Sequence, residues 1–425
     1  MEKYLKFCMI TTFYPPYNFG GDGIFVYRLS NELAQRGHHV EVIHCIDAYH
    51  VLNANTPRGD FPNHQNVKVH RLKSRMGFLS PFLTHQTGYP FLKGKKIREI
   101  LAENNKFDVI HFHNISLVGG PGILRHGKAI KLYTTHEHWL LCPLSVLWKF
   151  NNAACIKKSC FLCTLHSGRP PQLWRYSRML EKMSKNVDAF ISPSQFTIKK
   201  HYDMGLEIPF VHIPNFLPHL YEEKIEDRTN IADPLSRPYF LFVGRLEKSK
   251  GAHILIRIFR YFKKSDLLIA GDGQYGGQLR KLAKGVSNVK FLGKKSHKEL
   301  KRLYQNATAV IVPSLCYEVF GIVILEAFAM KTPVIVNNIG ALPELVEQSG
   351  GGFIYNNDSE LIKAMESLIA NPALRKELGE KGYQAYKKYW TAESNLEKYF
   401  NLIYKIAGNK KKEIKGEEEA MLRDA

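Results

Sequence analysis

Residues 312–346, VPSLCYEVFGIVILEAFAMKTPVIVNNIGALPELV, decide how the surrounding chain folds. An apolar run ends at Val312, and Pro313 opens a loop. The apolar segment that follows Gly321 predicts a helix, and Val334–Val336 predicts the next buried strand. The order predicts a strand–helix–strand unit, the building block of a parallel α/β sheet.

Two carboxylates in this unit are candidate site residues. Glu318 falls where the loop meets the helix, and Glu326 lies among apolar residues, where an ionised group is costly unless a partner hydrogen-bonds it. If the residues between them are helical, the two lie roughly 12 Å apart along the axis. The N–H groups of Val319, Phe320 and Gly321 then point outward at a helix start that favours phosphate. This order suits a sugar, a diphosphate and a ribose; the alternative is a salt-bridged buried Glu and a surface Glu.

The chain has 425 residues, which is enough for two domains. No apolar run reaches about 18 residues, so no membrane-spanning helix is expected. The short apolar N-terminal run predicts a first strand and not a signal peptide, which favours a cytoplasmic protein. The net charge of +21 favours anionic partners: nucleic acid, anionic lipid or phosphorylated small molecules. The basic residues are spread along the chain, which also fits a simple effect of genome composition.

Apolar runs and amphipathic segments alternate through both halves of the chain. Strands are predicted at 6–11, 39–46, 107–113, 130–135 and 188–194, and again at 239–244, 267–270, 289–292, 309–312 and 334–336. The fold class is therefore α/β, with two Rossmann-like doubly wound domains.

The predicted domains are residues 1–217 and 218–389, with a linker at 218–237. Residues 47–95 are expected to be irregular, with loops and short strands. Residues 390–409 are expected to form a helix that crosses back to the N-terminal domain, and residues 410–425 to form a disordered tail.

Two cations follow the first strand of the second domain. Arg245 and Lys250 could together neutralise a diphosphate leaving group, which elsewhere is done by a metal ion. The chain contains no Asp-x-Asp pair, the common metal clamp, so no cofactor is expected for catalysis. Taken singly, each cation could be a solvated surface charge.

Glycines mark further turns at the candidate site. Gly244 ends the first strand of the second domain, and Gly271 and Gly273 belong to a G-x-G-x-x-G match after a later strand. No acidic residue closes the strand that follows, which argues against nicotinamide binding. A tight turn lining a nucleotide pocket is the preferred interpretation. In the N-terminal domain, Gly20 and Gly21 could let the backbone approach a ligand or could form only a turn.

Three histidines lie near the carboxyl ends of predicted strands, where parallel sheets bind ligands. His136 follows the strand at 130–135 and is a candidate catalytic residue. His111 and His113 are interpreted as near-core histidines.

Four of the seven cysteines fall within 22 residues, in a loop at 142–163. They are Cys142, Cys155, Cys160 and Cys163. Cytoplasmic thiols are expected to be reduced, and the spacing suits a tetrahedral Cys₄ zinc site that is structural because no position is left for a catalytic water. An Fe–S cluster and four unconnected thiols are the alternatives.

Together these residues resemble the retaining family 4 glycosyltransferases (glycosyl transferases group 1), whose GT-B fold has two Rossmann-like domains facing a central cleft. The motifs that carry the resemblance are Glu318-x₇-Glu326, Pro333-Val334, Gly340-x-x-Pro343-Glu344, Gly244-Arg245, Lys250-Gly251, Gly271-Asp272-Gly273, Pro214-Asn215, Gly20-Gly21 and Arg36-Gly37-His38. One departure is Phe216, which stands where the family usually has Gly after Pro-Asn.

The resemblance implies a role for each matching residue. Glu318 would hold the donor sugar, Glu326 the ribose, and His136 would reach the sugar. The diphosphate would be bound by Arg245, Lys250, Gly21 and the N–H groups of Val319, Phe320 and Gly321.

The implied reaction moves a hexose from a nucleotide diphosphate sugar to an acceptor hydroxyl with retention, in cell-surface glycan or glycolipid synthesis. The leaving phosphate itself would take the acceptor's proton. A sugar-phosphate synthase or nucleotide-sugar epimerase of the same fold is an alternative. A basic nucleic-acid-binding protein is disfavoured, because no single predicted helix or strand carries clustered basic and aromatic residues.

The segment His70–Lys96 suggests how a lipid-linked acceptor could be reached. Its apolar residues could enter a headgroup region and its cations meet anionic lipid on the inner membrane face. The apolar residues are Phe78, Leu79, Phe82, Leu83, Tyr89, Phe91 and Leu92, and the cations are Arg71, Lys73, Arg75, Lys93, Lys95 and Lys96. The alternative is an ordinary loop packed on the domain.

Overall fold

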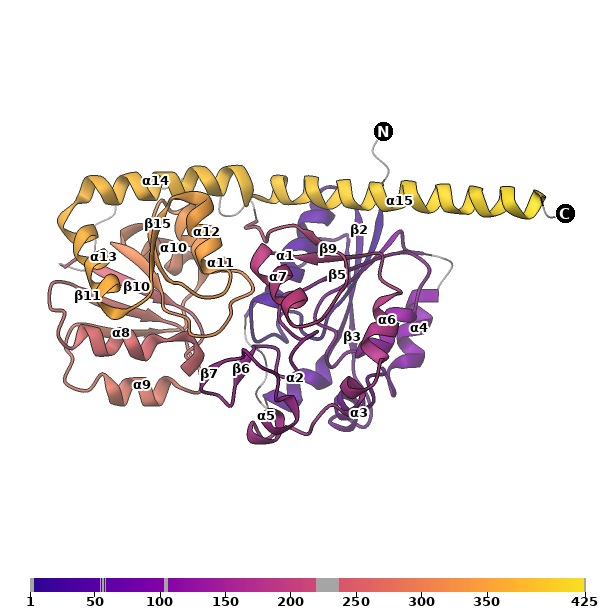
Figure 1. Ribbon diagram of the computed structural model, residues 1–425, viewed down its shortest axis with the longest axis horizontal. Helices are drawn as coiled ribbons and strands as arrows, with labels where there is room; N and C mark the ends of the chain where they lie inside the picture. The colour runs from indigo at the N-terminus through magenta and orange to yellow at the C-terminus, as the bar shows by residue number, and fades with distance from the viewer. Residues whose placement is uncertain are drawn as a thin grey trace.

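The computed structural model describes residues 4–53, 55, 57, 59–102, 106–218 and 237–423, with side chains as far as residue 412. These residues form two lobes, each built on one parallel sheet (Figure 1). The predicted α/β class with two Rossmann-like domains is confirmed. Residues 219–236, most of the predicted linker, lie outside the described residues.

The N-terminal sheet has seven strands in the order β3-β2-β1-β4-β5-β8-β9. The strands are β1 (Lys6–Ile10), β2 (His39–Cys45), β3 (Val67–Leu72), β4 (Val109–Phe112), β5 (Ile130–Thr134), β8 (Ala189–Ser192) and β9 (Phe210–His212). The helices are α1 (Gly21–Gln35), α2 (Ile46–Leu52), α3 (Leu79–Thr87), α4 (Gly94–Ala102), η2 (Pro121–Arg125), α5 (Cys160–His166), η3 (Leu173–Tyr176), α6 (Met179–Ser184) and α7 (Gln195–Asp203). The chain starts at the centre of the sheet and winds outward in both directions.

The C-terminal sheet has six strands in the order β12-β11-β10-β13-β14-β15. The strands are β10 (Tyr239–Val243), β11 (Asp266–Ala270), β12 (Val289–Gly293), β13 (Ala309–Val312), β14 (Val334–Asn337) and β15 (Gly352–Tyr355). The helices are η6 (Lys248–Lys250), α8 (Ala252–Phe259), α9 (Gly276–Leu282), α10 (His297–Asn306), α11 (Ile322–Ala329), α12 (Leu342–Ser349), α13 (Asp358–Ala370) and α14 (Pro372–Tyr389). A small antiparallel hairpin, β6 (Trp148–Lys149) with β7 (Ala153–Ala154), belongs to the N-terminal domain.

Both sheets are covered on both faces. In the N-terminal domain, one face packs on α1 and the C-terminal helix α15, and the other face on α4 and α6. In the C-terminal domain, α8, α9 and α13 cover one face, and α10, α11, α12 and α14 the other. Because strands of such sheets are buried on both sides, they are continuous apolar runs, which is why the sequence revealed them.

The unit β13–α11–β14 forms as predicted, but its helix starts later than the spacing argument assumed. Helix α11 begins at Ile322, after the extended N-cap Gly321 (φ −155°). Glu318 therefore lies in the loop, so the helical separation of roughly 12 Å does not apply. The loop stays extended because neighbouring loops bind its backbone; Ala341 N–H, for example, donates to Glu318 O at 3.0 Å.

Residues 47–95 are more regular than predicted, since α2, β3, α3 and the start of α4 fall there. Strand β3 is one of the short strands expected in this segment, but its position could not be predicted because it is the edge strand of its sheet. Of its residues, only Val67 and Leu72 are buried, so its apolar pattern is weak.

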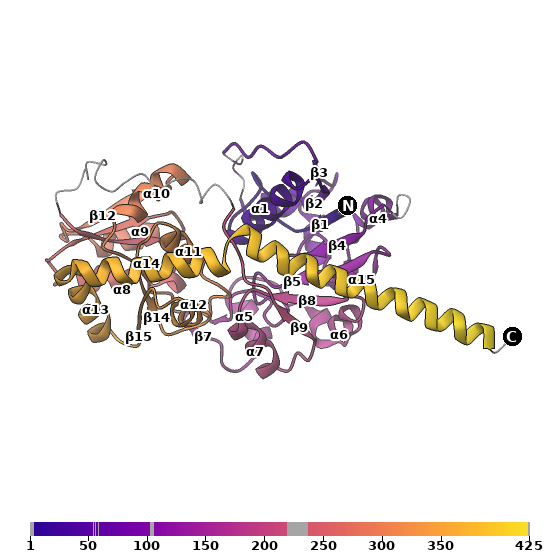
Figure 2. The ribbon, with the colours of Figure 1, turned by 90° about the horizontal axis from the view of Figure 1, so that it is seen from above.

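Helix α15 (Ala392–Arg423) leaves the C-terminal domain and lies across the N-terminal one (Figures 1 and 2). Its residues Leu396, Tyr399 and Ile403 are buried in the core formed with α1. Phe216, which departs from the family motif, is fully buried in the same core. Its ring centre lies 5.5 Å from that of Phe25, in an edge-to-face arrangement.

The disordered tail predicted from residue 410 is instead part of α15, which continues to Arg423. The tail is rich in Lys, Glu and Ala, and adding such residues to an existing helix is favourable. Among the helices that the structure describes, none is both long and apolar enough to cross a bilayer.

Gly251, the C-cap of η6, is required by the contact between two loops. It has a left-handed φ of 76°, and a Cβ there would lie 1.9 Å from the Pro313 carbonyl oxygen. We expect Gly251→Ala to cost about 1–3 kcal/mol of stability through strain and overpacking. A lower melting temperature by thermal unfolding would show this.

Gly277 in α9 provides the matched control, because a Cβ there would meet nothing within 4 Å. Gly277→Ala should leave the melting temperature unchanged or raise it slightly, since Ala favours helix. Equal melting temperatures for the two variants would contradict the loop-contact argument.

Candidate active site

Glu318 and Lys250 form an ion pair where two loops of the C-terminal domain meet. Lys250 follows β10, Glu318 follows β13, and Lys250 Nζ lies 2.5 Å from Glu318 Oε1. Ser314 Oγ donates to the same oxygen at 2.6 Å. Burial favours a raised pKa for the Glu318 carboxyl, but Lys250, Ser314 and Arg245 outweigh it and lower the pKa. Glu318 is thus a carboxylate and Lys250 a cation at neutral pH.

Contacts from the N-terminal domain fix the loop around Glu318. His138, after β5, places Nε2 3.1 Å from the Tyr317 carbonyl oxygen. Ser194 Oγ, before α7, donates to Val319 O at 2.7 Å. These contacts hold the Tyr317 and Val319 carbonyls across the domain boundary. Residues 319–321 precede the first turn of α11, and their role as a phosphate cradle stays a prediction.

Glu326 lies on α11 and is also tied to both domains. Tyr304 Oη donates to Glu326 Oε2 at 2.8 Å, and Arg28 of α1 places Nη2 3.6 Å from Glu326 Oε1. The side chain is largely buried. Because both oxygens have partners, the ionised carboxylate is tolerated in apolar surroundings, as its sequence context demanded.

Arg245 is half-exposed and pairs with Glu247 at 2.9 Å. Its guanidinium lies close enough to lower the pKa of Glu318. The structure therefore brings Arg245, Lys250 and Glu318 together at the carboxyl ends of β10 and β13, where parallel sheets bind ligands.

The glycines after β10 and β11 pack two loops against each other. A Cβ on Gly271 would lie 1.9 Å from the Gly244 carbonyl oxygen, and a Cβ on Gly273 would lie 2.5 Å from Leu246 O. These contacts explain why glycine is needed. That the three glycines line a nucleotide pocket stays a prediction.

His136 follows β5 and is held by other rings. Its Nε2 lies 2.9 Å from His113 Nδ1, and its ring centre lies 4.7 Å from that of Phe25, with the two rings tilted by 48°. Burial lowers the pKa of His136 to about 3, so the ring is neutral. His111 and His113 are buried, as predicted, and His111 Nδ1 lies 2.9 Å from Tyr399 Oη of α15. A chain of rings thus connects His136 to the crossing helix.

Gly21 is the first residue of α1. A Cβ on Gly21 would meet nothing within 4 Å, so open space lies beside it. The tightly packed glycine of this loop is Gly23, where a Cβ would lie 2.8 Å from Phe13 O.

Glu137, next to His136, was not selected from the sequence. The residue is half-buried, but its Oε1 is buried and has no hydrogen-bond partner among the described residues. Burial, and after it the Asp22 carboxylate, raise the pKa of Glu137 to about 8. The positive charge of Arg245, in the other domain, opposes this rise of the pKa. Glu137 therefore lies close enough to interact with one of the cations proposed to bind phosphate.

Glu344 caps a helix of the other domain. Its carboxylate accepts N–H bonds from Gln195 at 3.0 Å and Phe196 at 3.1 Å, at the start of α7. The sequence also missed Arg28, Tyr304 and His138 as partners of the site. Their contacts join residues far apart in the chain, so no local pattern could have indicated them.

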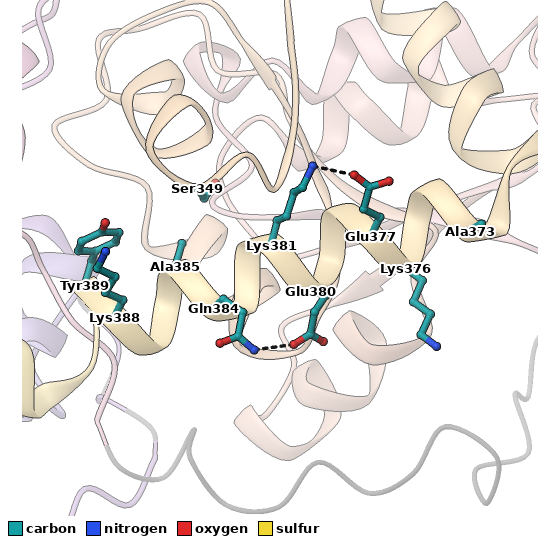
Figure 3. A pocket seen from close by; sticks show the side chains of 10 residues that line it. All are labelled: Ser349, Ala373, Lys376, Glu377, Glu380, Lys381, Gln384, Ala385, Lys388 and Tyr389. Carbon is teal, nitrogen blue, oxygen red and sulfur yellow. Dashed lines mark hydrogen bonds and ion pairs between the residues drawn. The ribbon is translucent and has the colours of Figure 1, made fainter.

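A hollow of about 720 Å³ runs along the outer side of α14 (Figure 3). None of the candidate site residues lines it. Within its lining, Lys381 pairs with Glu377 at 2.7 Å, and Gln384 donates to Glu380 at 2.7 Å. The carboxyl ends of the strands, and not this hollow, are therefore the candidate active site.

Comparison with known proteins shows the family of the chain. Residues 19–219 match Glycosyltransferase Family 4, and residues 223–385 match Glycosyl transferases group 1. The uncharacterized glycosyltransferase MJ1178 of Methanocaldococcus jannaschii is 34% identical over 333 residues, 77% of this chain and 82% of that protein. MJ1607 of the same organism is 28% identical over 421 residues, 95% of this chain and 98% of that protein. The chain belongs to glycosyltransferase family 4.

Solved structures show the same fold. Sucrose-phosphate synthase of Thermosynechococcus elongatus has a TM-score of 0.73 at 20% identity, covering 95% of this chain and 100% of that one. Anabaena HepE, solved with UDP and glucose, has a TM-score of 0.64 at 16% identity, covering 94% and 100%. The fold is GT-B, as the sequence resemblance implied.

Glu137 allows a test of the site's electrostatics by pH. Because its pKa is raised from 4.5 to about 8, the folded state binds more protons than the unfolded state between these values. The carboxylate therefore destabilises the wild type increasingly as pH rises. We expect Glu137→Gln to melt about 2–5 °C above the wild type at pH 8, with the difference vanishing near pH 4.5.

Glu347→Gln, which alters an exposed carboxylate of α12, is the control and should shift the melting temperature equally at both pH values. A pH-independent effect of Glu137→Gln would show that the carboxyl is ordinary.

Proposed function

We propose that the protein transfers a hexose from a nucleotide diphosphate sugar to an acceptor hydroxyl, with retention of the anomeric configuration. The observation that carries the proposal is the half-buried Lys250–Glu318 pair, 2.5 Å long, in the loops that precede α11. It offers one cation and one carboxylate side by side, a combination suited to a sugar diphosphate. Anabaena HepE, solved with UDP and glucose, has the same fold.

The proposal assigns the sugar to Glu318 and the diphosphate to Lys250. Lys250 and Ser314 both bind Oε1 of Glu318, which leaves Oε2 as the oxygen offered to sugar hydroxyls. Neutral His136 can donate or accept one hydrogen bond at the sugar without adding charge. Glu326 takes the ribose, for which Tyr304 and Arg28 hold its carboxylate in place.

In the proposed reaction, the bond from the anomeric carbon to the phosphate oxygen breaks as the acceptor oxygen bonds to the same face of that carbon. The acceptor's proton passes to the leaving phosphate. Lys250, Arg245 and the N–H groups of residues 319–321 stabilise the negative charge that develops there. These cations would do what a divalent metal ion does in other phosphate sites, so we propose that catalysis needs no cofactor.

Glu318→Gln tests the site assignment. It keeps the side-chain shape but removes the charge facing Lys250, and we expect turnover to fall by about 100-fold or more. Released nucleoside diphosphate would be measured with a panel of UDP-, GDP- and ADP-sugars. With the donor that the wild type uses, EDTA should leave the rate unchanged, and NMR of the product should show the donor's anomeric configuration.

Glu347→Gln is again the control and should keep wild-type turnover. Wild-type turnover of a folded Glu318→Gln variant would refute the site. An inverted product would refute retention but leave the site standing, and a rate that requires Mg²⁺ or Mn²⁺ would refute metal independence.

We further propose that the acceptor is a glycan carried on a lipid, reached by peripheral binding to an anionic membrane. Around α3, Phe78 and Phe91 are 64% and 65% exposed, and Phe82 stacks on Phe78 at 5.7 Å. Five of the six predicted cations are exposed: Arg71, Lys73, Arg75, Lys95 and Lys96. Exposed aromatic rings beside exposed cations suit a headgroup region.

The prediction that Lys93 meets anionic lipid is wrong. It is 5% exposed and pairs with Asp47 at 2.9 Å, so it serves the interior of the domain and not a membrane. Leu79, Leu83 and Tyr89 are half-buried and contribute less apolar surface than expected.

Sedimentation with anionic vesicles tests the membrane proposal. Each exposed cation contributes on the order of 1 kcal/mol, so replacing the five by Gln should weaken vesicle binding by more than about tenfold at low salt. Replacing five exposed lysines of the C-terminal domain, Lys281, Lys284, Lys294, Lys298 and Lys376, is the charge-matched control. Equal losses in the two variants, or no binding by the wild type, would contradict the proposal.

A further inference from the structure

The four clustered cysteines converge on one small cavity. Cys142 follows β5, Cys155 follows the β6–β7 hairpin, and Cys160 and Cys163 lie on α5. All four line a cavity of about 20 Å³, which also contacts Trp148 and Lys149. That volume holds about one water-sized sphere, so the fold gathers four thiols around space for a single atom or ion.

The backbone of the same segment is unusually strained. Ser145, Leu147, Phe150 and Asn151 all have positive φ, between 46° and 69°. Such conformations cost on the order of 1–3 kcal/mol each in non-glycine residues and persist only where other interactions hold them. The backbone N–H of Phe150 donates to Cys163 Sγ at 3.3 Å. One of the residues with positive φ is thus held by a contact to a clustered cysteine.

The surroundings are cationic. Lys149 lines the cavity, and Arg175 is a second cation close to Cys142 and Cys160. Four thiolates around a divalent cation carry a net charge of about −2, which Lys149 and Arg175 would offset. Soft sulfur ligands in a tetrahedral set select zinc over harder divalent cations.

We propose that Cys142, Cys155, Cys160 and Cys163 bind one Zn²⁺ ion as a structural site. Among the described residues, no three His, Cys, Asp or Glu side chains are already disposed around a common metal position. Binding must therefore draw the thiols inward from the cavity wall. The loss of their protons on binding couples the site to pH.

The proposed site supports the donor loop. Tyr317, the residue before Glu318, packs on the apolar cluster that contains Leu141, Cys142, Leu147 and Cys155. Lys200 lies 4.3 Å from the centre of the Tyr317 ring, and Lys248 Nζ lies 3.3 Å from Asn152 Oδ1 on the hairpin turn. An ion that fixes this segment would fix the surface on which the Glu318 loop rests.

The test is the zinc content of the full-length protein, purified in reducing buffer without chelator. We expect about one zinc per chain by elemental analysis, and loss of that zinc in Cys160→Ser. Cys8→Ala, which changes a buried cysteine of β1, should retain it. A strong zinc chelator should lower the melting temperature, with restoration by Zn²⁺ and not by Mg²⁺.

A titration of the wild type keeps the proposal testable if Cys160→Ser fails to fold. Stepwise addition of an organomercurial should release one zinc, followed with a metallochromic dye, as four thiols react. Protein that contains no zinc and takes up none when supplied with Zn²⁺ overturns the site. So does zinc that remains after the four thiols have reacted, because that zinc is bound elsewhere. Neither result depends on the proposed transfer activity.

Discussion

The ion pair between Lys250 and Glu318 is the interaction on which the site depends. Both side chains are half-buried, with 21% and 19% of their surface exposed, so a ligand that enters from solvent can reach them. Such a pair adds little net stability, because the cost of removing two charges even partly from water offsets their attraction. The pair instead holds two groups ionised at the edge of the solvent, where a ligand can exchange its own charges and hydroxyls for theirs.

Contacts between the domains keep that charge in position. His138 and Ser194 bind carbonyls of the loop at Glu318, Glu344 caps α7, and Arg28 reaches Glu326. Each contact joins polar groups across the domain boundary, so opening the two domains would leave several of them to water. Helix α15 lies across the N-terminal domain, and its Tyr399 touches the histidine chain that ends at His136. Domain position and site geometry are thus linked.

The sequence predicted the fold well because strands buried on both faces are continuous apolar runs. It also selected Glu318, Lys250 and Arg245 from their places after strands, and Glu326 from its apolar surroundings, and the structure brings the first three together. It could not place β3, whose edge position weakens its pattern, and it failed at the tail, where α15 continues. Arg28 and Tyr304 could not be found, because an ordinary helix surface gives no signal of the carboxylate that it will meet in the folded chain.

A crystal structure of the protein with a nucleoside diphosphate tests the central claim most directly. The account predicts that the diphosphate contacts Lys250 Nζ and the backbone N–H groups of residues 319–321, and that the 2.5 Å contact between Lys250 and Glu318 lengthens as phosphate replaces the carboxylate. A diphosphate bound away from these groups, with the ion pair unchanged, would contradict it.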